Sequence, residues 1–203
     1  IILMYYPNVI ESVGYIQPKV QIEIGCRSLR EPLKIAEFNT LVDEYYPNAS
    51  FTMPVIKVPT VVPERTFLEK IFLLHEEFSK PTQAIRVERL SRHLYDVYQL
   101  SKTEIKQNAL NYTELYETIV KHRYNFTRIS KVDYNLHQPQ TINPIPPSEV
   151  IKAWEIDYNT MLSEMIYGDA PTFEELIKEL TQLKSEINKL VWKMKTEFPL
   201  PKS

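Results

Sequence analysis

The side chains of this sequence that are best suited to chemistry lie in two segments whose apolar residues recur at helical spacing. The first segment places Lys70 beside an apolar stripe. The second holds three charged or titratable groups within five residues: Arg92, His93 and Asp96. A lysine ammonium meets phosphate as a compact positive charge, and an imidazole is suited to proton transfer because its ordinary pKa lies near neutrality. Helices that only bury an apolar face rarely need such a set, so the two segments indicate a function.

Lys70 also has a purely structural interpretation. Its apolar neighbours recur at i, i+4 and i+7, the pattern of one buried helix face, so the lysine itself could lie at the edge of that face. There its ammonium would be solvated and paired with Glu69 or Glu77. Spacing within one helix leaves the solvated and the phosphate-binding interpretations open.

The second segment predicts one charged helix face. Arg89, His93 and Asp96 stand at i, i+4 and i+7, so they would share a face of a single helix. Arg92 and Asp96, at i and i+4, would be able to form an ion pair. His93 is either a proton-transfer group between an arginine and an aspartate or a structural residue bonded to Asp96, because ion pairs on helix surfaces are common.

Glu23 is a candidate metal ligand. The residues Val20–Gly25 alternate apolar with polar, as in a half-buried strand, and Glu23 projects from the polar side. A carboxylate on a strand is the kind of oxygen ligand that Mg²⁺ takes, usually together with substrate phosphates. A solvent-facing residue of an amphipathic strand is the alternative.

A basic and aromatic segment follows later in the chain, at residues 121–128 and Lys131. Interleaved cations and rings can hold phosphates and stack on bases. The same pattern arises where cations gather near the carboxyl end of a helix. Zinc clusters find no support, because the four histidines lack ligand spacing, and no G-x-S-x-G sequence marks a nucleophilic serine.

Composition limits the classes of protein that need to be considered. The net charge of −2 predicts no general attraction to nucleic acid, so any such contact must be a local patch. Cys26 is the single cysteine, which excludes an internal disulfide and fits a reducing compartment. No apolar run approaches the roughly 20 residues of a membrane span, and no signal peptide is visible in the sequence as given. We therefore expect a cytoplasmic protein with no membrane contact.

The pattern of elements divides the chain at residue 62. The first part predicts three short strands and one helix, at Ile1–Tyr6, Val20–Gly25, Thr52–Val58 and residues 34–46. The second part predicts a helical domain, residues 63–203, with helices at about 63–80, 84–101, 112–124 and 147–167 and a last one that opens at Thr172. Between the third and fourth of these, residues 131–147 are an irregular, proline-rich crossing.

Five segments, in this order, resemble the nucleotidyltransferase toxins of the AbiEii/AbiGii abortive-infection family: Val20–Leu29, Pro63–Lys70, Ser91–Asp96, Asp157–Met161 and Thr172–Leu176. The family is similar to the nucleotidyltransferases of the DNA polymerase β type. The resemblance implies an α+β fold, with a partial nucleotidyltransferase sheet over residues 1–62 followed by a larger helical bundle. It also implies transfer of a nucleoside monophosphate from an NTP to an acceptor, with RNA such as tRNA as the expected acceptor and an antitoxin protein as partner.

The resemblance also implies roles for single residues. Glu23 matches the third metal-binding acid of the family, which holds Mg²⁺ against the NTP. Lys70 and Asp96 match its catalytic lysine and aspartate, and Lys70, Arg92 and His93 would contact the nucleotide. His93 stands where many relatives have an aspartate, which puts the role of that position in doubt.

The Gly-Ser turn and Asp-x-Asp pair of the family occur nowhere in this sequence. We expect them upstream of Ile1; the alternative is that the chain is a degenerate member of the family. The chain alone would then be inactive, because a single carboxylate cannot assemble the metal site. Two other interpretations remain: a non-catalytic module that binds RNA or protein, and a housekeeping nucleotidyltransferase without toxicity.

Overall fold

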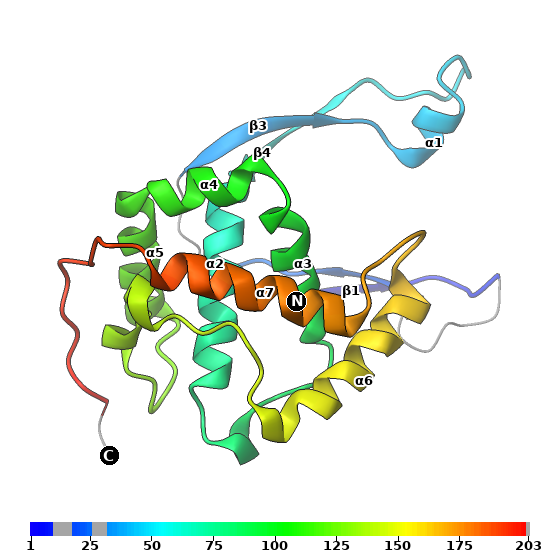
Figure 1. Cartoon of the computed structure of the whole chain (residues 1–203). Coiled ribbons are helices and arrows are strands. Elements are labelled where there is room, and N and C mark those ends of the chain that lie inside the picture. Colours follow the sequence, from blue (N-terminus) through cyan, green and yellow to red (C-terminus); the bar gives the residue numbers. More distant parts are fainter. Residues whose placement is uncertain (10–17, 26–31, 202–203) are drawn as a thin grey trace.

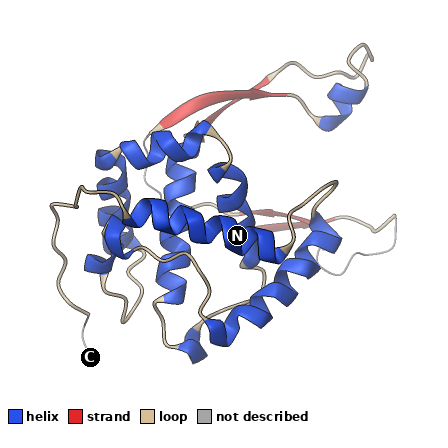
Figure 2. Ribbon diagram, in the orientation of Figure 1, coloured by secondary structure: helices blue, strands red, loops and turns tan. Residues whose placement is uncertain are grey.

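The computed structural model describes residues 1–9, 18–25 and 32–201, and Cys26 lies outside this part of the chain. The described residues form two β-hairpins and a bundle of helices, so the expected α+β class is confirmed (Figures 1 and 2). The strands are β1 Ile2–Tyr5, β2 Lys19–Ile22, β3 Leu33–Phe38 and β4 Ile56–Val61. The α-helices are α1 Leu41–Tyr45, α2 Pro63–Phe78, α3 Ser91–Ser101, α4 Glu104–Asn111, α5 Thr113–Phe126, α6 Ser148–Met165 and α7 Phe173–Asn188.

Each hairpin is a separate antiparallel pair. Strands β1 and β2 pair with Ile2 opposite Ile22, and β3 pairs with β4 so that Leu33 lies opposite Val61. In Figure 1 both hairpins extend away from the helices toward the right of the view. Most of their apolar side chains are exposed, and every buried apolar side chain of the described residues lies at Phe67 or later. The core is therefore helical, while the division into domains at residue 62 stays a prediction.

The predicted helix over residues 34–46 is wrong. Residues Leu33–Phe38 form β3, and only the short helix α1 follows. Thr40 begins α1, because its hydroxyl accepts a hydrogen bond from the amide of Asp43 while the Asp43 carboxylate accepts one from the amide of Thr40. The strand expected at Thr52–Val58 also shifts, to Ile56–Val61. It therefore contains Pro59 rather than Pro54.

Helix α2 runs through the centre of the bundle and packs against α3, α4 and α5 (Figure 1). It begins at Pro63, whose fixed φ and missing amide hydrogen suit the first helical position. Its apolar residues Phe67, Leu68, Ile71, Phe72 and Leu74 are all buried. Helix α2 therefore supplies the middle of the core, and it must satisfy whatever polar groups it carries into that core.

The helical half departs from expectation at three helix ends. Helix α3 begins at Ser91 rather than near Ala84, and a 3₁₀ turn at Thr82–Ala84 precedes it. The expected third helix is two helices, because α4 ends at Asn111 and α5 starts after Tyr112. Helix α7 has the predicted capping box at Thr172 but ends at Asn188, short of the apolar stripe that the sequence extends to Met194. Two further 3₁₀ helices, Tyr134–His137 and Pro139–Thr141, lie in the expected crossing. No helix of the described residues is both long enough and apolar enough for a membrane span.

A buried ion pair joins α2 to α5. The Arg123 guanidinium donates to both carboxylate oxygens of Glu76, from Nε at 2.8 Å and from Nη2 at 2.5 Å. The imidazole of His137 lies 3.3 Å from the same carboxylate and stacks on the ring of Tyr134. Burial by itself would raise the pKa of Glu76, but the hydrogen bonds from Arg123 and His137 lower it to about 2.

We expect Glu76→Gln to weaken the fold and to change its acid response. The substitution leaves Arg123 buried without an anion, a loss of about 3–5 kcal/mol in unfolding free energy. Because the pKa of Glu76 in the folded state lies below its ordinary value of 4.5, the stability from its charge is present above that pH and is lost as the pH falls toward about 2. Denaturant titrations from pH 7 down to pH 2 would measure both effects. Glu155→Gln, at a surface ion pair of α6, is the control, and an equal acid response of the Glu76 variant and the wild type would contradict the prediction.

Candidate active site

The structure brings Lys70, His93 and Asp96 together between α2 and α3. The Lys70 Nζ lies 2.7 Å from Oδ2 of Asp96 and 2.9 Å from Nδ1 of His93. The side chains of Lys70 and Asp96 are 26% and 39% exposed, whereas that of His93 is buried. The cluster therefore has a buried base and an open side that faces solvent.

The contact with Lys70 sets the protonation state of His93. An ammonium has only donors, so Nδ1 of His93 must be the acceptor, and the ring is neutral with its proton on Nε2. Burial lowers the pKa of His93, and the charges of Lys70 and Arg92 lower it further, to about 4, against the opposing effect of Asp96. His93 is thus neutral at physiological pH, and its 3.9 Å approach to Asp96 is not an ion pair.

The ammonium of Lys70 is held in place and keeps one hydrogen-bond donor for a ligand. Two of its three N–H groups donate to His93 and Asp96. No partner for the third lies among the described residues, so it is available to an anion that arrives from solvent. Arg92, the neighbour of His93 on α3, is exposed and adds positive charge at this position. The arrangement can bind a phosphate oxygen at a fixed point.

The structural interpretation of Lys70 as a partner of Glu69 or Glu77 is wrong. Glu69 pairs with Arg65 at 2.9 Å, one turn earlier on α2. Glu77 is buried, and its carboxylate accepts hydrogen bonds from Lys80 at 2.7 Å and from the backbone and side chain of Arg86. The Lys70 ammonium instead crosses to α3.

The predicted face of Arg89, His93 and Asp96 is only partly present. His93 and Asp96 lie on one face of α3, but Arg89 lies before the helix, with a φ of 59° in the left-handed region. The expected pair of Arg92 with Asp96 is not among the ion pairs of the described residues. Asp96 has Lys70 as its partner instead.

Glu23 is not joined to this cluster by any hydrogen bond or ion pair of the described residues. It follows the end of β2 and is exposed, and it accepts a hydrogen bond from Gln21 of the same hairpin. No hydrogen bond or ion pair joins it to Lys70, His93 or Asp96 in the described part of the chain. Within that part no group of three His, Cys, Asp or Glu side chains is arranged to hold a metal ion. The described residues do not fit a complete magnesium site.

The sequence marks Asp157 only as part of a family-like segment and gives it no role, whereas in the structure it places the start of α3. Its carboxylate, carried on α6, accepts hydrogen bonds from the amides of Arg89 at 2.7 Å and Ser91 at 3.0 Å, and from the Ser91 hydroxyl at 2.5 Å. It thereby satisfies free amides at a helix start that has no cap from its own sequence. Local spacing gives no signal for a cap that comes from 66 residues away.

We expect Asp157→Ala to lower the unfolding free energy by about 1–2 kcal/mol, because three donors at the start of α3 lose their acceptor. Urea titration at pH 7 would measure the loss. Glu155→Ala, two residues earlier on α6, removes only an exposed pair with Lys152. Its effect should stay below about 1 kcal/mol. Equal losses from the two variants would contradict the capping role.

We expect the His93 ring to titrate far below the ordinary pKa of 6.5, near the value of about 4. Lys70→Met should raise that pKa, because it removes a neighbouring positive charge, and Arg92→Ala should raise it less. Any stability that depends on a neutral His93 is present above about pH 6.5 and is lost as the pH falls toward about 4. NMR of the imidazole signals would measure these values, and a wild-type pKa near 6.5 would contradict the geometry.

Comparison with known proteins supports the resemblance seen in the sequence. The model of one protein family, described as the nucleotidyl transferase AbiEii toxin of a type IV toxin–antitoxin system, matches residues 1–179. No curated protein and no solved structure matches the chain. The matched region includes both hairpins and the whole Lys70 cluster. The chain belongs to the AbiEii nucleotidyltransferase toxin family.

Proposed function

We propose that the protein transfers a nucleoside monophosphate from an NTP to an RNA acceptor such as tRNA, and that it thereby acts as the toxin of a type IV toxin–antitoxin pair. The observation that carries the proposal is the Lys70 ammonium, held by His93 and Asp96 with one donor free. The family match supports the class of reaction.

In this reaction a hydroxyl of the acceptor attacks the α-phosphorus of the NTP. The new oxygen–phosphorus bond replaces the bond to pyrophosphate, which leaves, and the hydroxyl proton is lost to solvent. Lys70 contacts the triphosphate and balances the negative charge that grows on the leaving pyrophosphate. Asp96 and the neutral His93 hold Lys70, and Arg92 is the second cation available to the nucleotide.

Magnesium belongs to the proposal only in part. Glu23 is proposed as one ligand, because its carboxylate is exposed and, among the described residues, has Gln21 alone as a hydrogen-bonding neighbour. One carboxylate does not make a magnesium site.

The remaining features of the proposal follow from the family. The partner is an antitoxin protein, and the place of action is the cytoplasm. Residues 1–62 form the nucleotidyltransferase part, and residues 63–203 form the helical domain. A non-catalytic module that binds RNA or protein is the second candidate, favoured by the lack of a three-acid cluster among the described residues.

Incubation of the native full-length protein with labelled NTPs and total RNA tests the reaction. We expect labelling by the wild type and a loss of about 100-fold or more in Lys70→Ala and Asp96→Ala, because a charge used in the transition state is removed. Lys102→Ala is the matched control, because Lys102 also forms a 2.7 Å ion pair between helices, with Glu179. It should label like the wild type.

Two results would argue against the assignment. Equal labelling by wild type, Lys70→Ala and Asp96→Ala would remove the proposed roles. RNA binding without any labelling, with or without added Mg²⁺, would favour the non-catalytic module. In bacteria induced to express the full-length protein, growth arrest by the wild type but not by Lys70→Ala separates a toxin from a housekeeping enzyme.

A further inference from the structure

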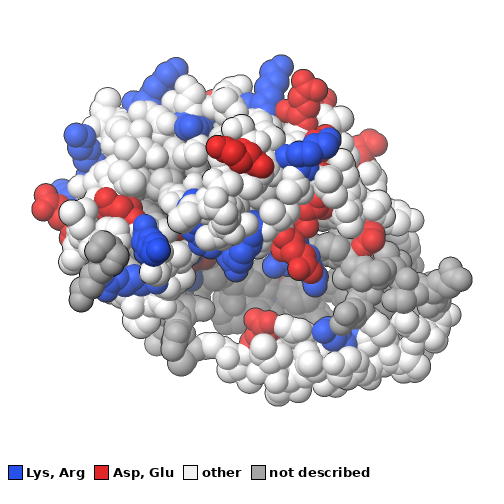
Figure 3. Space-filling model, turned by 90° about the horizontal axis from the view of Figure 1, so that it is seen from below, with Lys and Arg blue, Asp and Glu red and all other residues white. Residues whose placement is uncertain are grey.

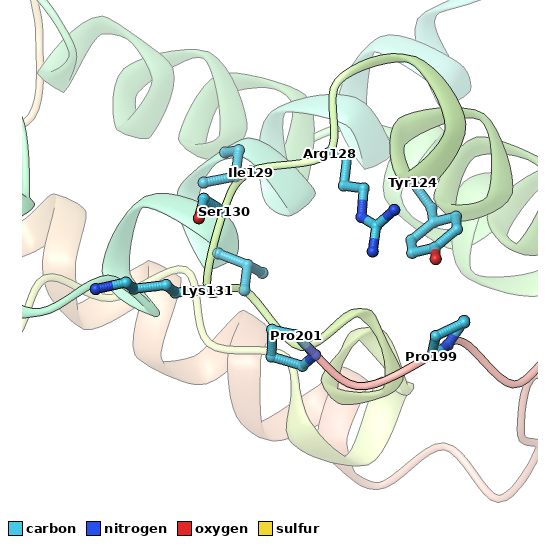
Figure 4. Close-up of a pocket in the computed structure, with 8 residues that line it drawn as sticks. Tyr124, Arg128, Ile129, Ser130, Lys131, Pro199 and Pro201 are labelled. Carbon is cyan, nitrogen blue, oxygen red and sulfur yellow. The ribbon is translucent and has the colours of Figure 1, made fainter. Parts of the chain in front are cut away.

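A pocket lies on the other side of α2 from the Lys70 cluster, beyond the end of α5. It has a volume of about 380 Å³ and is open on one side. Its walls come from the end of α5, the loop that follows, and the C-terminal segment, with Tyr124, Arg128, Ser130, Lys131, Pro199 and Pro201 among the lining residues (Figure 4). No acidic side chain is among the described residues that line it.

The pocket collects the unpaired cations of the basic and aromatic segment. Lys121 pairs with Glu117 at 3.3 Å, and Arg123 is committed to Glu76 inside the core. Arg128 has no acidic partner within the described chain, and the same holds for Lys131. Lys121 and Arg123 therefore form ion pairs within the fold, while Arg128 and Lys131 remain available to a ligand.

An aromatic ring orients the guanidinium of Arg128. Its guanidinium carbon lies 4.8 Å from the centre of the Tyr124 ring, a cation–π contact that leaves the N–H edge free. Figure 4 shows Arg128 beside Tyr124 with Pro199 opposite, whereas the ammonium of Lys131 points to the far side of the loop. Arg128 is thus the cation best placed to meet a ligand in the pocket.

The walls of the pocket are fastened to the core. Tyr124 packs against the rings of Tyr134 and Phe198, at 5.5 Å and 4.8 Å between centres. Asn135 donates to the carbonyl of Phe198 and accepts from its amide, both at 2.8 Å. Because Phe198 directly precedes Pro199, these two bonds hold the C-terminal wall in place without a ligand.

Size and charge together point to one class of ligand. A volume of 380 Å³ lies in the range of small-molecule sites, which is more than a bare phosphate needs. A stacked arginine edge matches the oxygens of a phosphate in a two-point contact. Pro199 and Pro201 offer apolar surface beside it, against which a sugar and base can pack.

We propose that this pocket binds one nucleotide unit of an RNA strand, with a backbone phosphate at Arg128. The choice of RNA rests on the proposed function, because an enzyme that modifies an RNA hydroxyl must also bind that RNA at nucleotides away from the hydroxyl. In Figure 1, α5 lies on one side of α2 and α3 on the other, so the pocket and the Lys70 cluster are separate points along such a strand. Figure 3 shows both signs of charge intermixed over the described part of one face, which suits a local contact rather than a broad basic surface.

RNA binding by the full chain, without NTP or metal, tests the inference. Fluorescence anisotropy would follow a labelled tRNA mixture and a short labelled single-stranded RNA over a series of salt concentrations. Arg128→Ala should weaken binding about tenfold and reduce the salt slope by about one. Arg128→Lys should keep the slope but still bind more weakly, because an ammonium lacks the flat fork that lies on Tyr124. Lys178→Ala removes an exposed charge on α7 and should leave both quantities unchanged.

Other outcomes would overturn the inference. One is an unchanged RNA affinity in Arg128→Ala, and another is a loss of RNA affinity in Lys178→Ala equal to that in Arg128→Ala. A third is that inorganic phosphate, at constant ionic strength, displaces the labelled RNA as effectively as unlabelled RNA does. A labelled NTP that loses affinity in Arg128→Ala while RNA does not would assign the pocket to free nucleotide instead. Since no transfer is measured, RNA binding that depends on Arg128 supports the pocket even if the full-length protein labels nothing. If the full-length protein labels RNA normally but its RNA affinity does not depend on Arg128, the RNA-binding role of the pocket is wrong and the proposed transfer reaction is unaffected.

Discussion

The helices of this protein cannot close around α2 until the charges on that helix have found partners. Glu76 and Glu77 are almost completely buried, and a buried carboxylate without a partner would cost several kcal/mol. Each is matched from a different part of the chain, Glu76 by Arg123 of α5 and Glu77 by Arg86 in the loop before α3. The pairs fix which helix lies against which side of α2, while the apolar residues around them supply the driving force. The same packing of helices around α2 brings His93 and Asp96 of α3 to Lys70.

Local chemistry decided which parts of the fold were predictable. Helices with a clear first turn, Pro63 in α2 and Thr172 in α7, begin where their residues indicate, because proline geometry and the capping box act within one turn. The segment at residues 34–46 has apolar residues at spacings that suit a helix or a strand, and pairing with a strand about 25 residues away decided for β3. Helix α3 is shorter than expected because its start is fixed by α6.

The candidate site shows the same division between local and distant information. His93 and Asp96 are close because they are three residues apart on one helix, which spacing alone predicts. That Lys70 would cross to them, rather than pair with its own neighbours on α2, depends on the packing of two helices and came only from the family resemblance. Asp157 belongs to a family-like segment, but nothing in its local sequence indicates that it caps α3. Glu23 remains a proposed ligand on the resemblance alone, because no hydrogen bond or ion pair of the described residues joins it to the cluster.

The double hold on Lys70 has a consequence for the thermodynamics of binding. A free lysine side chain has roughly 2 kcal/mol of rotamer entropy to lose when it is immobilised on a ligand. In this structure the ammonium is already immobilised by His93 and Asp96, so that loss belongs to the folding of the protein. An anion that binds to the free N–H therefore meets a charge whose ordering is complete, and less of the interaction energy is spent on fixing the side chain.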